Sequence, residues 1–359
     1  MAVFYYDTMV YRYIAYFLLV LSAISCTMTG RSSGAAEGNA CAAFFELLPG
    51  AVVTVSPFTG QRDTLKTDRP FDNIVCMSTS HVAFLSEIGS ASAVRGVSGV
   101  RFLSDSTVRE NPDVVETGYE AAFDFEAVLA LEPDVVLAYT VSSVEPPYLS
   151  RLRSLGVRVF ILYDHLEHHP LARAEYVRLA GALTGRQELA DSVFNDVSEK
   201  YLALAASVSG TAASAGKTRV LLNLPYSDMW YVPGAESYMS CLIRDAGGMV
   251  LGAEPGSSES SVIYMEKAYD LSRDADFWLN TGNCTSRNQI EAIHPLFSRF
   301  GPMSSPHSVF NNVARVNEAG GNDFWESGAV HPELILSDLI SIFGGKAGKG
   351  TLHYYVEVE

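Results

Sequence analysis

The feature that most constrains this chain is a long stretch of helical periodicity between Pro170 and Ser209. From Tyr176 onward, apolar residues recur at steps of three and four, which places them on one side of a helix. Gly185 interrupts the pattern, so we expect a short helix and then a long one from Arg186 to Ser209. At 1.5 Å per residue the long helix would span about 36 Å, more than a crossover between neighbouring strands needs. The pattern predicts a rigid spine that joins two lobes; the alternative is an ordinary helix inside one large domain.

Composition and motifs bound the class of protein. The chain has 359 residues, 48% of them apolar, which is enough to bury two cores. Its formal net charge of −16 argues against a nucleic-acid partner and against lying flat on an anionic membrane. The sequence holds no glycine-rich nucleotide-binding motif, no nucleophile elbow and no zinc-protease motif. We therefore expect neither an enzyme nor a bound cofactor.

The N-terminal residues have the pattern of an export signal followed by a lipid anchor. An uncharged apolar run, Tyr13 to Ile24, follows Arg12. This run is too short for a membrane-spanning helix, which needs about 20 residues, but it suits the core of a signal peptide. Cys26 comes directly after the apolar core, as the acylated cysteine of a lipoprotein does, with ordinary cleavage as the alternative. We therefore predict a signal peptide at 1–25 and a lipid anchor and tether at 26–43, so that only the anchor contacts the membrane.

Buried-strand and helical patterns alternate on both sides of the spine. Apolar strands are expected at 73–77, 95–98, 135–139, 157–162, 219–224 and 276–280, alternating with helices that include 81–88, 148–155, 237–248 and 332–343. Strands separated by helices predict parallel sheets with right-handed crossovers. We expect an α/β fold of two Rossmann-like lobes with central, mainly parallel sheets, at 44–169 and 210–345, joined by the spine at 170–209. The tail at 346–359 should add a strand, with the early hairpin at 52–66 as its candidate partner.

Two segments carry a resemblance to a known family. FDFEAVLALEPDVVLAY (123–139) resembles the N-x-E-x-(I/L)-x-x-L-x-P-D-L-(I/V) segment of the ferric-siderophore-, haem- and cobalamin-binding proteins of ABC importers. SYMSCLIRDAGG (237–248) resembles a second segment of the same proteins. The likeness covers about residues 70–345. It implies a clamshell protein of the periplasm that captures an iron-siderophore, haem or cobalamin ligand between its lobes and delivers it to the permease of an ABC importer.

Candidate ligand-binding residues of the first lobe come from loops at the carboxyl ends of strands, where open α/β sheets bind ligands. Ser78, Thr79 and Ser80 lead from a strand into a helix and leave backbone N–H groups for a ligand. Helix capping is the alternative role for these hydroxyls. His81 is a candidate iron ligand; the alternative is that it packs near the start of its helix. Arg101 is a candidate partner for an anionic ligand; the alternative is a solvated arginine on the surface.

Aromatic residues complete the predicted ligand site. The resemblance implies that Tyr139, directly after the PDVVLA segment, faces the ligand. Trp230 and Tyr231 are its expected counterparts on the second lobe. Large flat rings suit corrinoid, porphyrin or catecholate ligands. Burial in the core of a lobe is the alternative for each of the three.

One glutamate lies early in a helical segment of each lobe: Glu126 in DFEAVL and Glu266 in YMEKAY. The resemblance implies that these carboxylates meet arginines on the permease. The alternative is a purely local role, because a carboxylate in the first turn of a helix gains about 0.3–1 kcal/mol from the helix dipole.

Two other functions compete with solute binding. The run His165-Leu166-Glu167-His168-His169 favours a direct metal-ion receptor, although no other residues are spaced to complete a zinc site, and solvated loop histidines are the alternative. An exported enzyme or assembly factor on the same scaffold is the second, because a fold does not fix a function. The cysteines at 41, 76, 241 and 284 show no metal-type spacing, and their disulfide pairing cannot be assigned from sequence. We expect those at 76 and 241 to be buried thiols.

Overall fold

The computed structural model describes residues 41–227, 229–347 and 352–359, which belong to one compact unit. The signal peptide, Cys26 and nearly all of the tether lie outside these residues. None of the described helices is both long enough and apolar enough to cross a lipid bilayer. All four described cysteines are free thiols, with Cys76 and Cys241 buried as predicted, Cys284 also buried and Cys41 exposed.

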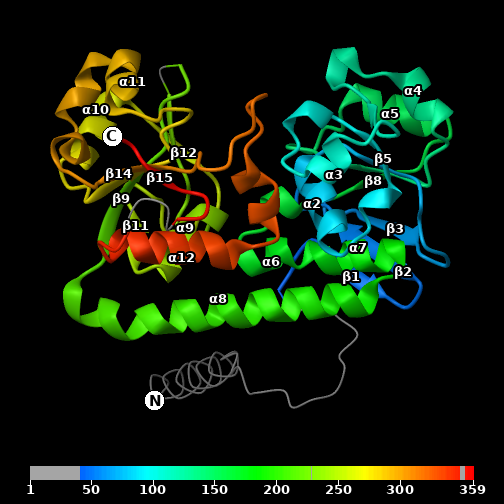
Figure 1. Ribbon diagram of the computed structural model, residues 1–359, viewed down its shortest axis with the longest axis horizontal. Helices are drawn as coiled ribbons and strands as arrows, with labels where there is room; N and C mark the ends of the chain where they lie inside the picture. Colours follow the sequence, from blue (N-terminus) through cyan, green and yellow to red (C-terminus); the bar gives the residue numbers. More distant parts are fainter. Residues whose placement is uncertain (1–40, 228, 348–351) are drawn as a thin grey trace, which may run out of the picture. The chain divides into compact units, whose positions relative to one another are not determined.

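The first lobe is built on a five-stranded, wholly parallel sheet with the order β6-β5-β4-β7-β8. Its strands are β4 (Ile74–Cys76), β5 (Val94–Val97), β6 (Val115–Glu116), β7 (Val135–Ala138) and β8 (Val159–Ile161). Helices α2 (Thr79–Glu87), α3 (Ser106–Arg109), α4 (Phe125–Ala130) and α5 (Pro147–Ser154) connect them (Figure 1). Every residue of β4, β7 and β8 is buried, as expected for strands covered on both faces. The predicted parallel sheet is confirmed.

A separate three-stranded antiparallel sheet precedes the first lobe. It consists of β1 (Phe45–Leu48), β2 (Ala51–Val55) and β3 (Arg62–Lys66). The β2–β3 hairpin was predicted, but β1 was not. The hairpin is fastened beside β8, because Arg158 donates to the Asp63 carboxylate at 2.7 Å and to the Thr64 carbonyl at 2.8 Å.

The spine consists of α6 (Pro170–Ala174), α7 (Tyr176–Thr184) and α8 (Gln187–Ala215). Gly185 separates α7 from α8 in a left-handed conformation with φ of 68°, which confirms the predicted break. Helix α8 continues beyond the predicted end at Ser209 and stops at Ala215, before Gly216 with φ of 77°. The apolar stripe ends earlier than the helix, which is why periodicity placed the end too soon.

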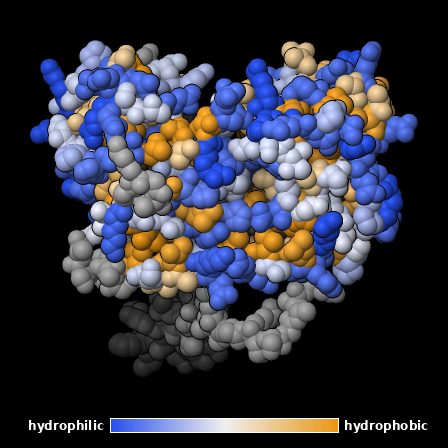
Figure 2. All heavy atoms as spheres, viewed as in Figure 1, coloured by the Kyte–Doolittle hydropathy of each residue, from blue (hydrophilic) through white to orange (hydrophobic). Residues whose placement is uncertain are grey.

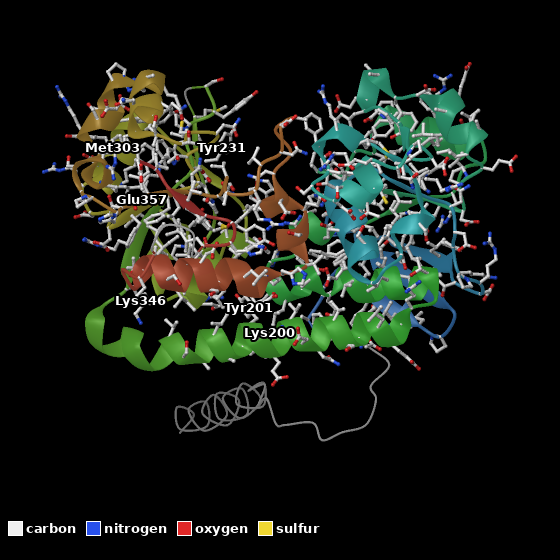
Figure 3. All side chains as sticks on the ribbon, viewed as in Figure 1. Lys200, Tyr201, Tyr231, Met303, Lys346 and Glu357 are labelled. Carbon is white, nitrogen blue, oxygen red and sulfur yellow. The ribbon has the colours of Figure 1, made fainter. Side chains whose placement is uncertain are left out.

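Helix α8 packs against α7 of the first lobe and α12 of the second (Figure 1). Most of the predicted stripe is buried, with Phe194, Val197 and Tyr201 almost inaccessible to solvent. Figure 3 shows Tyr201 between α8 and α12, while Lys200 points away and pairs with Asp196. The Tyr201 hydroxyl donates to Asp245 of the second lobe at 2.7 Å. The spine is therefore anchored to both lobes.

The second lobe is built on a sheet with the order β11-β9-β13-β14-β15. The strands β9 (Thr218–Leu222), β11 (Gly248–Val250), β13 (Phe277–Leu279) and β14 (Val309–Asn311) are parallel, and β15 (Val356–Glu357) is antiparallel to β14. The helices are α9 (Tyr238–Asp245), α10 (Met265–Ser272), α11 (Arg287–Ile293) and α12 (Pro332–Phe343). A short antiparallel pair, β10 (Trp230–Val232) with β12 (Ser261–Ile263), lies outside this sheet. The α/β fold of two mainly parallel lobes is confirmed.

The candidate partner for the tail strand was wrong. β15 pairs with β14 of the second lobe and not with the early hairpin. The Asp338 carboxylate on α12 accepts hydrogen bonds from the backbone N–H groups of His353, Tyr354 and Tyr355, which fixes the approach to β15. The rings of Tyr354 and Tyr355 are buried in the same lobe. These contacts hold the tail on the second lobe.

Candidate functional site

A pocket of about 760 Å³ opens on the first lobe where four neighbouring strands end. Its lining comes from the loops after β4, β5, β6 and β7: Met77, Ser78, Thr79, Ser98, Gly99, Arg101, Phe102, Glu116, Gly118, Tyr119 and Tyr139. We call it the first-lobe pocket. Carboxyl ends of parallel strands are where sheets of this kind bind ligands, and the volume is in the range of small-molecule sites. Four of the predicted residues meet here: Ser78, Thr79, Arg101 and Tyr139.

Aromatic rings and one cation supply the chemistry of the first-lobe pocket. Tyr119, Tyr139 and Phe102 line it, and the Arg101 guanidinium lies 4.5 Å from the centre of the Phe102 ring. Burial raises the pKa of Tyr139 above its ordinary value, and a hydrogen bond with Tyr119 raises it further, so the phenol stays neutral at neutral pH. The pocket therefore offers flat apolar contact, phenolic hydrogen bonds and a positive charge to an occupant.

Sequence reasoning missed Tyr119 and Phe102. Phe102 follows β5 and Tyr119 follows β6 within a few residues, so position relative to a strand end was the signal that could have found them. Glu116 was missed as well, and it organises the lining. Its carboxylate accepts hydrogen bonds from the backbone N–H groups of Gly99 and Val100 at 2.8 Å and of Gly118 at 2.9 Å. One acidic side chain thus fixes the loops that carry the aromatic rings.

The first two residues of the hydroxyl-rich run after β4 border the first-lobe pocket. Ser78 is the N-cap residue of α2, yet its side chain accepts no cap hydrogen bond from the described residues and instead lies 2.9 Å from the Ser80 hydroxyl. The Ser78 side chain therefore does not cap α2. Ser78 and Thr79 border the first-lobe pocket at the start of α2, where the positive end of the helix dipole lies.

The structure corrects the predictions for Ser80 and His81. Both side chains are buried, away from the pocket surface. The Ser80 hydroxyl donates to Asp164 at 3.0 Å, and His81 Nε2 lies 3.4 Å from the same carboxylate, within ion-pair distance but outside hydrogen-bond geometry. Burial alone would raise the pKa of Asp164, but the interactions with His165 and His81 and the charge of Arg173 hold that pKa well below its usual range. Ser80 and His81 therefore tie the start of α2 to Asp164 in the interior of the lobe.

Trp230 is also corrected, because it is a core residue and not a ligand contact. Only 1% of it is exposed. Its indole N–H donates to the Leu222 carbonyl at 2.8 Å, and its ring packs on Trp278, Phe297 and Phe300. Alternation along β10 turns Trp230 inward and the next residue, Tyr231, outward.

Tyr231 belongs to an exposed cluster that we call the second-lobe aromatic patch: Tyr226, Met229, Tyr231, Val262 and Tyr264. Tyr231 lies directly opposite Val262 across the β10–β12 pair, so these side chains share a face. The Tyr231 hydroxyl lies 3.8 Å from the Met229 sulfur, and Tyr264 directly follows β12. Tyr231 is 38% exposed and lies near β12 (Figure 3). A contiguous exposed apolar patch on a soluble protein typically marks a binding surface.

The two lobes touch through contacts that we call the interlobe clasp, between residues 101–105 of the first lobe and 317–326 of the second. The Glu326 carboxylate accepts hydrogen bonds from the backbone N–H groups of Ser104 and Asp105 at 2.8 and 2.9 Å. Asn317 donates to the carbonyls of Arg101 and Leu103 at 3.1 and 3.0 Å. The loop that carries Arg101 into the first-lobe pocket is therefore held by the second lobe.

Close backbone approach is part of the clasp. A Cβ atom at Gly321 would collide with the Phe102 carbonyl, so only glycine allows this contact. Beside the clasp, His331 bridges Glu87 of α2 at 3.1 Å and Glu333 of α12 at 3.0 Å. Burial would lower the pKa of His331, but the hydrogen bonds to the two carboxylates raise it to about 10. Figure 2 shows a notch between the lobes on the viewed face.

Glu126 and Glu266 both lie in the first turn of a helix, in α4 and α10, and both are exposed. That position satisfies the helix-dipole role and leaves each carboxylate open to a partner. The structure describes no partner protein, so permease docking stays a prediction.

The three histidines of the 165–169 run do not converge. His165 Nε2 lies 3.1 Å from the Thr140 carbonyl, His168 packs edge-on against Phe44, and His169 accepts from the Leu171 N–H at 3.1 Å. The buried Glu167 carboxylate accepts from the N–H groups of Ala43 and Phe44. Among the residues described, no three metal-ligating side chains form a cluster. The geometry of this run therefore does not favour a metal-ion receptor.

Two parallel α/β lobes, a helical spine and an aromatic pocket at strand ends define the class of two-lobed solute-binding proteins. Residues 74–299 match the family model described as periplasmic binding protein. The chain belongs to this family.

Individual comparisons agree with that assignment. An uncharacterised lipoprotein of Methanocaldococcus jannaschii is 21% identical over 306 residues, which cover 80% of this chain and 69% of the relative. A cobalamin-binding protein of Halobacterium salinarum is 26% identical over 258 residues, covering 72% of this chain and 66% of the relative, just under two thirds of its length. The crystal structure of a periplasmic heme-binding protein from Pseudomonas aeruginosa superposes with a TM-score of 0.62 at 17% identity, covering 80% of this chain and 98% of that one.

Proposed function

We propose that this chain is the solute-binding lipoprotein of an ABC importer, which captures an iron-siderophore, haem or cobalamin-type ligand between its lobes and delivers it to the permease. The first-lobe pocket carries the proposal. This chain belongs to the family, and its first-lobe pocket is lined by aromatic rings and an arginine at the carboxyl ends of the strands. No catalytic step is part of the proposal.

The chemistry of the two lobes supports a large, flat, partly anionic ligand. Tyr119, Tyr139 and Phe102 offer rings on the first lobe, and the second-lobe aromatic patch offers Tyr231 and Tyr264. Rings give a large contact area at a low cost in conformational entropy. Arg101 supplies a positive charge for the carboxylate, phosphate or catecholate groups that such ligands carry. The name of the Halobacterium salinarum relative favours testing cobalamin first.

The spine and the clasp indicate modest motion during capture. Helix α8 is a single continuous connection of 29 residues, packed against both lobes. The interlobe clasp adds direct hydrogen bonds between the lobes. A stiff connection with interlobe bonds favours small adjustments over wide hinge opening. Once loaded, the protein would dock through the exposed carboxylates of Glu126 and Glu266, one per lobe, onto permease arginines.

A spectroscopic titration tests the ligand assignment. The purified full-length chain is titrated separately with cyanocobalamin, haemin and a ferric hydroxamate siderophore, all of which absorb visible light. We expect one of them to bind with a dissociation constant below about 10 μM, roughly −7 kcal/mol. If none of the three reaches that affinity, the ligand assignment is wrong even though the family assignment stands.

Single substitutions then locate the site. Tyr139→Ala and Tyr231→Ala should each weaken binding by about 1–3 kcal/mol, because each removes a contact anchor from one lobe. Phe58→Ala is the matched control, since Phe58 is an exposed aromatic residue of the first lobe that does not line the first-lobe pocket. Equal affinities for all three variants would place the ligand elsewhere.

A further inference from the structure

A second pocket lies on the first lobe, outside the site described so far. It has a volume of about 430 Å³ and lies between the β2–β3 hairpin, the loop after β7 and strand β8. We call it the hairpin pocket. Its hairpin side, residues 54–63, precedes residue 74, where the match to the family model begins. The pocket therefore includes residues that precede the matched segment.

Two threonines from different elements line the hairpin pocket, and their hydroxyl groups are open to it. Thr54 on β2 is 1% exposed and Thr140 after β7 is 7% exposed. Within the described part of the chain, neither side-chain hydroxyl makes a hydrogen bond, although the Thr140 carbonyl accepts one from His165. Both hydroxyls are therefore available to donate and accept hydrogen bonds with an occupant of the pocket.

The charges of the lining cancel. Arg62 and Arg153 oppose Asp63 and Glu145. Each of these four side chains already has a partner of opposite charge. Arg62 pairs with Glu46, Arg153 with Glu145 at 3.2 Å, and Asp63 with Arg158 at 2.7 Å. A lining with no net charge and no unpaired ion gives an ionic ligand no advantage.

The remaining lining is rich in hydroxyl and amide groups beside an aromatic ring. Ser56, Thr59, Gln61, Ser142 and Ser143 surround the pocket. Tyr163 also lines the pocket, and the Phe58 ring lies edge-on to it at a centroid separation of 6.4 Å. Hydroxyl and amide groups both donate and accept hydrogen bonds, and an aromatic ring offers a flat apolar contact. Neutral sugars carry hydroxyl groups on a ring with apolar C–H faces. We propose that the hairpin pocket binds a neutral saccharide unit. The proposal does not depend on the proposed transport function.

The test is a binding measurement with defined sugars. Saturation-transfer difference NMR on the full-length chain uses D-glucose, D-mannose and N-acetyl-D-glucosamine as separate probes. We expect transfer to at least one sugar. Thr54→Val and Thr140→Val should each weaken its binding about tenfold, because each keeps the side-chain shape and removes one hydroxyl. Absence of transfer to all three sugars overturns the proposal.

Controls separate loss of the hydroxyl from damage to the fold. Thr54→Ser and Thr140→Ser keep the hydroxyl and should retain binding. If they lose it as fully as the valine variants do, the hydroxyls are not the contacts. Thr64→Val lies on the same hairpin, is exposed and does not line the pocket, so it should bind as wild type does. Inorganic phosphate and acetate should not displace the sugar, and displacement by either would contradict a neutral site.

Discussion

The interlobe clasp makes a quantitative prediction about pH. Glu326 is 3% exposed and accepts two backbone N–H groups from the other lobe. Burial raises the pKa of its carboxyl from an ordinary 4.5 to about 7, with Asp323 and Asp105 raising it further against the effect of the two N–H groups. A change of that size corresponds to about 3 kcal/mol.

The sign follows from proton binding. Because the pKa is higher in the folded state, the folded protein binds the proton more tightly between pH 4.5 and 7. The resulting stabilisation is fully present below about pH 4.5 and is lost as the pH rises through 7. Glu326→Gln cannot titrate and lacks this dependence. The free energy of unfolding of the variant, relative to wild type, should therefore rise by about 3 kcal/mol between pH 4.5 and pH 8.

Urea unfolding followed by circular dichroism at pH 4.5, 6, 7 and 8 measures this difference, and the other titrating groups cancel between the two proteins. Glu167→Gln is the matched comparison. Burial raises the pKa of Glu167 to about 7 as well, and its partners, Ala43 and Phe44, are unrelated to the clasp. The two pH-dependent differences should add in the double variant. A difference between Glu326→Gln and wild type that stays constant across the pH range would refute the reasoning about the clasp.

Three further predictions concern the core, the docking surface and the anchor. Trp230→Ala should lower the free energy of unfolding by about 3–5 kcal/mol in a urea titration, because it empties a buried aromatic cluster; a loss under 1 kcal/mol would contradict its core position. Glu126→Gln with Glu266→Gln should leave ligand affinity unchanged and abolish uptake with the reconstituted permease, while each single variant is impaired less; normal uptake by the double variant would remove docking from both. Cys26→Ala should move the protein from the membrane fraction to the soluble exported fraction, and unchanged membrane association would exclude the anchor.

The sequence alone determined the repeating local structure. Apolar steps of three and four predicted α8, and Gly185 marked its start because glycine adopts positive φ without strain. The continuous apolar run of β7 and the helix over 332–343 were likewise visible. These signals are local, since each depends on residues within a few positions of one another. They sufficed for the α/β fold, the parallel sheets and the family.

Only the tertiary structure decided which segments meet. The sequence did not predict β14, because its three residues are flanked by polar ones. Its last residue, Asn311, is nevertheless buried, and its side chain donates to the carbonyls of Gly282 and Cys284. β15 found its partner in β14, and Trp230 turned inward while Tyr231 turned outward. Half of the predicted ligand residues reached the first-lobe pocket, but Glu116 and Glu326 were not recognisable beforehand. Their partners are backbone N–H groups brought near by folding, and a one-dimensional pattern carries no record of such long-range approach.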